Sequence, residues 1–63
     1  MNKVQKQTLI DWVVVNPEGK VIAWIKKQRN GGYMLEYKGI AGRCQDFYIT
    51  FSEAKQSAKT IEP

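Results

Sequence analysis

The hydrophobic and polar positions along the chain follow the pattern of short strands separated by turns. Residues 8–15 (TLIDWVVV) are nearly continuously apolar and β-branched, which predicts a strand covered on both faces. Residues 21–28, 33–38 and 45–51 predict three further strands, and the last two alternate apolar with polar side chains. Ala54, Ala58 and Ile61 then recur at helical spacing, so a short helix is expected over residues 53–61.

The first turn signal is the sequence NPEG at residues 16–19. It predicts a three-residue loop in which Gly19 takes the left-handed conformation and Asn16 pairs with Lys20. Continued without interruption, this register places Trp12 directly opposite Trp24. The two indoles would then pack on one face, which is a better interpretation than an aromatic ligand cage.

The second turn signal is Asn-Gly at residues 30–31, the strongest two-residue hairpin signal in the chain. It predicts that Trp24 lies opposite Tyr37. A glycine-bracketed loop over residues 39–44 follows, and we expect Tyr37 to pair with Phe47 in the last strand. That register would place Lys38 across from Asp46, a favourable pair of opposite charges. Ser52 is the expected N-cap of the helix that follows.

These elements predict an α+β fold. We expect a four-stranded antiparallel β-meander with one short C-terminal α-helix packed on one face, in the order β-β-β-β-α. Residues 1–7 are polar and lack a pattern, so they are interpreted as a flexible N-terminal arm. Residues 8–63 would form a single small domain.

The predicted register sorts the side chains onto two faces. The expected core face contains Ile10, Trp12, Val14, Ile22, Trp24, Tyr33, Leu35, Tyr37, Phe47, Ile49 and Phe51. The opposite face carries an aliphatic patch of Val13, Val15, Val21, Ala23 and Ile25. One helix cannot cover both faces, so the patch predicts an interface for a homodimer or a protein partner. Alternatively, the arm or a strongly twisted sheet covers it.

Composition narrows the function classes. Ten basic and six acidic residues give a net charge of +4, which favours an anionic partner. Cys44 is the only cysteine and histidine is absent, which fits a reducing cytoplasm and argues against nucleophilic catalysis and metal binding. Asp11, Glu36 and Asp46 are interpreted as ion-pair partners. The chain shows no signal peptide, membrane span, cofactor motif or evident small-molecule substrate, so we expect a non-enzymatic protein.

A basic segment is the sharpest local signal. Its side chains are of the types that bond phosphates and base edges, and Lys27 and Arg29 would project together from the face opposite the core. The expected nucleic-acid-binding residues are Lys27, Gln28, Arg29, Asn30, Lys38 and Arg43. The alternative is a solvated strand end whose lysines discourage edge aggregation.

The second half of the chain resembles the arm-type DNA-binding domains of phage integrases. The resemblance rests on Gly32-Tyr33, Tyr37-Lys38-Gly39, Arg43, Phe47, Thr50-Phe51-Ser52-Glu53-Ala54 and Ala58. It implies a three-stranded sheet packed on a C-terminal helix, with the opposite sheet face in the DNA major groove. Lys27, Arg29 and Lys38 would face the groove. The chain departs from that family in its apolar N-terminal strand and in the lack of a following recombinase domain.

Two functions remain open from the sequence. The first is an accessory nucleic-acid-binding protein, in particular a DNA-binding one, that uses a basic strand of its sheet. The second is a protein-interaction module, or an inhibitor of the kind found among small phage and mobile-element products, which binds a partner or itself through the aliphatic patch.

Overall fold

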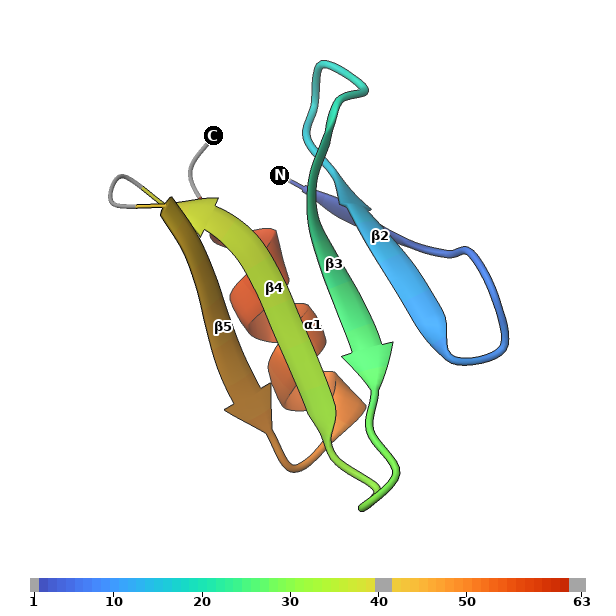
Figure 1. The fold of residues 1–63 in the computed structure, drawn as a ribbon. Coiled ribbons are helices and arrows are strands. Elements are labelled where there is room, and N and C mark those ends of the chain that lie inside the picture. Colours follow the sequence, from blue (N-terminus) through green and yellow to red (C-terminus); the bar gives the residue numbers. More distant parts are fainter. Residues whose placement is uncertain (1, 40–41, 62–63) are drawn as a thin grey trace.

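A computed structural model describes residues 2–39 and 42–61, which form a five-stranded antiparallel sheet and one helix (Figure 1). The elements are β1 (Lys3–Lys6), β2 (Asp11–Val15), β3 (Val21–Lys27), β4 (Tyr33–Gly39), β5 (Gly42–Tyr48) and α1 (Phe51–Lys59). Neighbours in the sheet are neighbours in the sequence, so the α+β meander with a C-terminal helix is confirmed. The predicted number of four strands is wrong, because Lys3–Lys6 in the expected arm forms β1 and pairs with β2.

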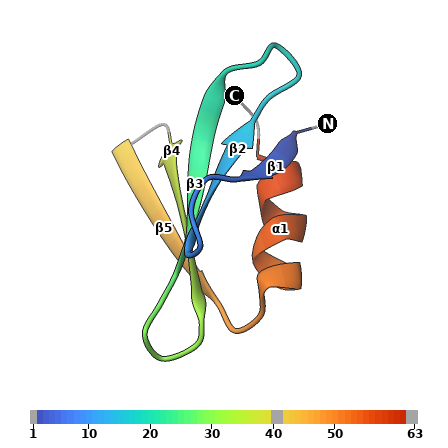
Figure 2. The ribbon, with the colours of Figure 1, turned by 90° about the vertical axis from the view of Figure 1, so that its right-hand side faces the viewer.

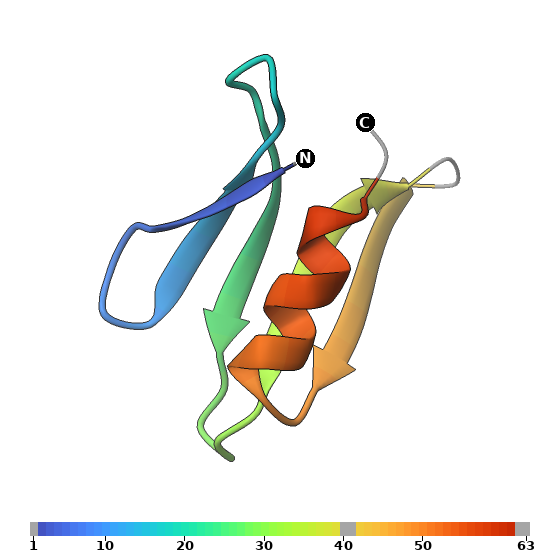
Figure 3. The ribbon, with the colours of Figure 1, turned by 180° about the vertical axis from the view of Figure 1, so that it is seen from behind.

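The helix covers one face of the sheet and leaves the other uncovered (Figures 2 and 3). The buried hydrophobic residues between the two layers are Val14, Ala23, Ile25, Leu35, Ala54 and Ala58. Ala54 and Ala58 thus belong to the expected helical stripe, and Ile61 packs beside it. Small side chains on both layers let the helix backbone approach the strands closely.

Three aromatic rings close one end of this core. The rings of Trp12 and Phe51 have centroids 4.6 Å apart, and Tyr33 lies 5.4 Å from Phe51 and 5.9 Å from Trp12. Such tilted and edge-on contacts add to the burial of their apolar surface. The helix therefore begins where its first residue, Phe51, can enter this cluster.

The N-cap of α1 is Thr50, not Ser52 as predicted. The Thr50 side chain accepts a hydrogen bond from the backbone N–H of Glu53 at 3.2 Å, and its hydroxyl lies 3.0 Å from the Glu53 carboxylate. Threonine at the cap and glutamate three residues later have the spacing of a capping box, although Glu53 here accepts from the Thr50 hydroxyl, and the acidic side chain also suits the helix N-terminus. The helix therefore starts two residues earlier than its apolar stripe suggests.

The first hairpin contains both a confirmed prediction and a wrong one. The N–H of Asn16 donates to the carbonyl of Lys20 at 2.9 Å, and Gly19 has a φ of 85°, as expected for the three-residue loop. A β-bulge then inserts one extra residue, so Val15 pairs with Val21 but Val14 pairs with Ala23. Because side chains alternate along a strand, the bulge places the later residues of β3 on the faces opposite to those predicted.

Because these β3 residues lie on the opposite faces, the predicted aliphatic patch does not form. Ala23 and Ile25 are completely buried beneath the helix, whereas Trp24 points to the uncovered face and lies opposite Val13. Val13 and Val15 stay on the uncovered face, and Val21 is 43% exposed. The predicted pairing of Trp12 with Trp24 is therefore wrong, and Trp12 lies opposite Ile25.

The second hairpin is also one residue longer than predicted. The N–H of Gln28 donates to the carbonyl of Gly32, and Gly31 has a φ of 92°, so residues 29–31 form a three-residue loop. Trp24 consequently lies opposite Glu36 instead of Tyr37. This shift cancels the one from the bulge, and β4 buries Leu35 as expected.

The register of β5 differs from the prediction as well. Tyr37 lies opposite Cys44 and Lys38 opposite Arg43, so the expected pairs with Phe47 and Asp46 do not form. The strands extend to Gly39 and from Gly42, so most of the expected loop is strand, and its residues 40–41 lie outside the described part. Phe47 on the uncovered face is 49% exposed. Ile10 and Ile49, also assigned to the core, are 55% and 77% exposed.

A single buried side chain joins the two ends of the described chain. The Asn2 amide nitrogen donates to the carbonyl of Ala58 at 3.0 Å and to that of Ile61 at 2.9 Å. The Ala58 carbonyl also accepts a hydrogen bond from the backbone N–H of Ile61, so Asn2 adds a second donor at the C-terminal end of α1. This contact positions β1 against the helix end.

We expect Asn2→Ala to lower the free energy of unfolding by about 1–3 kcal/mol, because the two hydrogen bonds from the buried Asn2 amide are lost. Urea unfolding followed by tryptophan fluorescence measures this change. Gln5→Ala is the matched control because Gln5 is exposed on β1. An Asn2→Ala protein as stable as the Gln5→Ala protein would contradict the capping role.

Candidate functional site

The candidate site is the sheet face opposite α1, which we call the open face. Cross-strand pairs place on it Lys3, Gln5, Asp11, Val13, Val15, Val21, Trp24, Lys26, Met34, Glu36, Lys38, Arg43, Gln45 and Phe47. Figure 1 views the sheet from this side, with the helix behind it. The open face therefore combines apolar, aromatic and basic side chains on a rigid ladder.

Glu36 lies at the centre of the open face and holds two cations. Its carboxylate oxygens lie 3.3 Å from Nζ of Lys26 and 3.5 Å from a guanidinium nitrogen of Arg43, and Gln45 donates a hydrogen bond at 3.3 Å. The Glu36 side chain is only 13% exposed, whereas those of Lys26 and Arg43 are 52% and 80% exposed. Glu36 thus orients two solvent-facing cations.

The same contacts shift the pKa of Glu36. The hydrogen bond from Gln45, followed by the bond from Lys26, lowers the pKa below its ordinary value of 4.5, and partial burial opposes the shift. Because the folded state favours the ionised carboxylate, this group stabilises the fold above pH 4.5. Its contribution is lost as the pH falls through the lowered pKa.

Two large aromatic side chains are exposed on the open face. Trp24 on β3 is 38% exposed and Phe47 on β5 is 49% exposed. The Phe47 ring rests against the backbone of Gly32, where a Cβ atom would overlap the ring. Glycine at this position thus leaves the space that the partly exposed Phe47 ring occupies.

The structure separates the six predicted nucleic-acid-binding residues into three places. Lys38 and Arg43 lie opposite each other on the open face. Lys27 lies opposite Tyr33, on the helix side of the sheet, so it does not face the same way as Lys38. The remaining three, Gln28, Arg29 and Asn30, lie at the β3–β4 turn.

Sequence reasoning missed Trp24, Lys26 and Phe47 as surface residues. All three belong to strands whose faces were reversed in the predicted register. A usable signal is the alanine at position 23, since a small side chain matches the alanine stripe of α1 better than an indole does. That match would have placed Ala23, and not Trp24, beneath the helix.

The carboxylates form structural contacts. The Tyr37 hydroxyl donates to Asp46 at 3.0 Å, and this hydrogen bond, with the charge of Asp46, raises the pKa of Tyr37 above its usual value of 10. Within residues 2–39 and 42–61, no group of three or more potential metal-ligating side chains comes together. In the same residues, no helix is long and apolar enough to cross a membrane.

Comparisons with protein-family models, curated proteins and solved structures find no match for this chain.

We expect the NMR titration midpoint of the Glu36 carboxyl carbon to lie below 4.5 and to rise in Gln45→Ala, which removes the largest cause of the shift. Gln56→Ala on α1 is the matched control and should leave the midpoint unchanged. Acid unfolding should begin at a higher pH in Gln45→Ala than in the control. An unchanged midpoint in Gln45→Ala would show that the amide does not stabilise the carboxylate.

Proposed function

We propose that this protein is a non-enzymatic nucleic-acid-binding protein that contacts its partner through the open face. One observation carries the proposal: an uncovered sheet face presents two exposed aromatic rings, Trp24 and Phe47, among the cations Lys26, Lys38 and Arg43. Cations neutralise phosphates and accessible rings stack on bases, which together make up a single-strand-binding surface.

The aromatic rings favour unpaired bases over a duplex. Stacking requires the face of a base, and bases in a duplex already stack on one another. The Phe47 ring is half-exposed, so part of its surface is available to a base. The proposed surface includes the predicted residues Lys38 and Arg43 but not Lys27, which lies on the helix side of the sheet.

Charge supports the same surface. Lys26 and Arg43 are held at Glu36 with more than half of each side chain exposed, and Lys38 adds a third cation opposite Arg43. Glu36 neutralises part of this charge, so affinity for phosphates should be moderate. Neutralisation of three phosphates on a single strand gives a slope of about −2 for log K against log[salt].

We expect binding of a fluorescein-labelled 12-nucleotide single strand, measured by anisotropy, with a salt slope of about −2 and weaker binding of the matching duplex. Phe47→Leu should weaken binding by about fivefold or more through lost stacking. Arg43→Glu should weaken it by about tenfold, since it places a negative charge at the contact. Lys55→Glu on the helix is the control, because it changes the net charge equally on the other side of the sheet.

Equal losses in Arg43→Glu and Lys55→Glu would indicate attraction by net charge alone and overturn the proposed surface. Absence of binding at low salt would overturn the function and favour a protein partner. A specific observation supports that second candidate: Leu9, Ile10 and Ile49 are exposed in the loops before β2 and after β5. Self-association through these side chains would appear as a dimer in sedimentation.

A further inference from the structure

A cleft opens where β3 and β4 part from each other. The ladder between these strands ends at the pair Ala23 and Tyr37, although β3 begins at Val21 and β4 continues to Gly39. The two strands diverge beyond that pair (Figure 1). A cleft of about 330 Å³ occupies the gap, a volume within the range of small-molecule sites.

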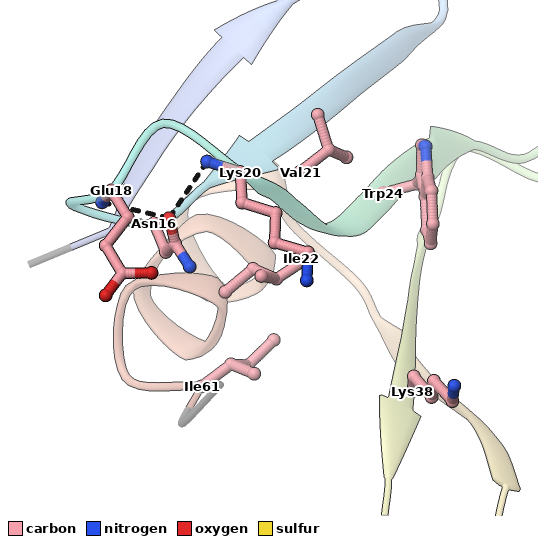
Figure 4. Close-up of a pocket in the computed structure, with 8 residues that line it drawn as sticks. All are labelled: Asn16, Glu18, Lys20, Val21, Ile22, Trp24, Lys38 and Ile61. Carbon is pink, nitrogen blue, oxygen red and sulfur yellow. Dashed lines mark hydrogen bonds between the residues drawn. The ribbon is translucent and has the colours of Figure 1, made fainter.

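The walls of the cleft come from four parts of the fold. Its lining residues are Asn16, Glu18, Lys20, Val21, Ile22, Trp24, Lys38 and Ile61. Figure 4 shows the side chains of Ile22 and Ile61 on one side of the space and Trp24 with Lys38 on the other. The bulge at Ile22 and the end of the helix thus supply an apolar wall, and an indole faces it across the gap.

The charges around the cleft are unequal. Lys20 and Lys38 approach from opposite walls, and Glu18 is the only acidic side chain in the lining. Among residues 2–39 and 42–61, neither lysine forms an ion pair. The side-chain oxygen Oδ1 of Asn16 accepts hydrogen bonds from the backbone N–H groups of Glu18 and Lys20, which keeps the turn in place. The site therefore carries a net positive charge beside an apolar surface.

We propose that this cleft binds an organic acid with a compact apolar body and one carboxylate. The body packs between Ile22 and the Trp24 indole, and the carboxylate lies between the amines of Lys20 and Lys38. Apolar lining with a few convergent polar groups is the usual composition of small-ligand sites. The chemistry fits a free aromatic or branched acid and equally the C-terminal residue of a peptide. The cleft shares Trp24 and Lys38 with the proposed nucleic-acid-binding surface, but its test uses no nucleic acid, so each proposal can fail without the other.

The test is an NMR titration of the 15N-labelled protein with 3-phenylpropionate and with its neutral amide, 3-phenylpropionamide. We expect the acid to shift the Trp24 indole N–H and the backbone amides of Ile22 and Lys38 at millimolar concentration. The neutral amide should bind at least about twofold more weakly, because it lacks the charge that the lysines recognise. Equal binding of acid and amide, or shifts confined to other residues, would overturn the proposal.

Three variants test the sign of each charge. Lys38→Gln should weaken binding of the acid about two- to fivefold, as expected for one exposed ion pair. Glu18→Gln should strengthen it by a similar factor, and Lys55→Gln, far from the cleft, should leave it unchanged. A loss in Lys55→Gln equal to that in Lys38→Gln would overturn the site.

A second pair of ligands identifies the source of the acid. Tighter binding of N-acetyl-glycyl-phenylalanine than of 3-phenylpropionate would assign the cleft to a peptide C-terminus, and the reverse order would assign it to a free acid. Either order supports the cleft as a carboxylate site. If neither acid binds at concentrations up to about 20 mM, the proposal is overturned.

Discussion

The β-bulge between β2 and β3 is the constraint on which the rest of the structure depends. One additional residue after the turn brings Val14 opposite Ala23, and every later side chain of β3 changes face. Ala23 and Ile25 then lie beneath the helix, and Trp24 lies on the open face. Without this inserted residue, an indole would occupy the space where the helix now approaches the sheet.

Small, aliphatic and aromatic side chains pack between the helix and the sheet at different places. Ala23, Ala54 and Ala58 are completely buried between the layers, together with the larger Ile25. Trp12 and Phe51 pack where the helix begins, with ring centroids 4.6 Å apart. A single helix of nine residues can cover only one face of five strands, so large side chains remain on the other. The open face is thus a direct consequence of the small number of elements.

The sequence analysis predicted the features that depend on local chemistry. The Asn16 loop, the alanine stripe of the helix and the antiparallel order each follow from neighbouring residues, and each is confirmed. The strand faces were predicted correctly for β2 and β4 only. The residues at the bulge do not reveal it, because Val21 and Ile22 are both apolar and either could face the core; only the small side chain of Ala23 indicates the face of β3.

The candidate site was less predictable than the fold for the same reason. A register error of one or three residues exchanges the two faces of a strand. Lys26 and Phe47 therefore lie on the open face, where Lys27 and Asp46 were predicted to lie. Lys38 and Arg43 were placed on the open face because β4 kept its predicted orientation and because the β4–β5 pairing brings them together. The errors in the predicted site therefore came from the register of the strands and not from the types of residue.

The contact between Asn2 and the end of α1 has a consequence for the order of folding. The two hydrogen bonds join residues 56 and 59 positions apart, whereas the hairpins pair residues close in sequence. Closing so long a loop is entropically costly and slow compared with forming a hairpin. During synthesis, Asn2 and β1 leave the ribosome before α1, and Ile61, which bonds Asn2, is among the last described residues to emerge. β1 therefore reaches its final position only after the C-terminal end of α1 has formed.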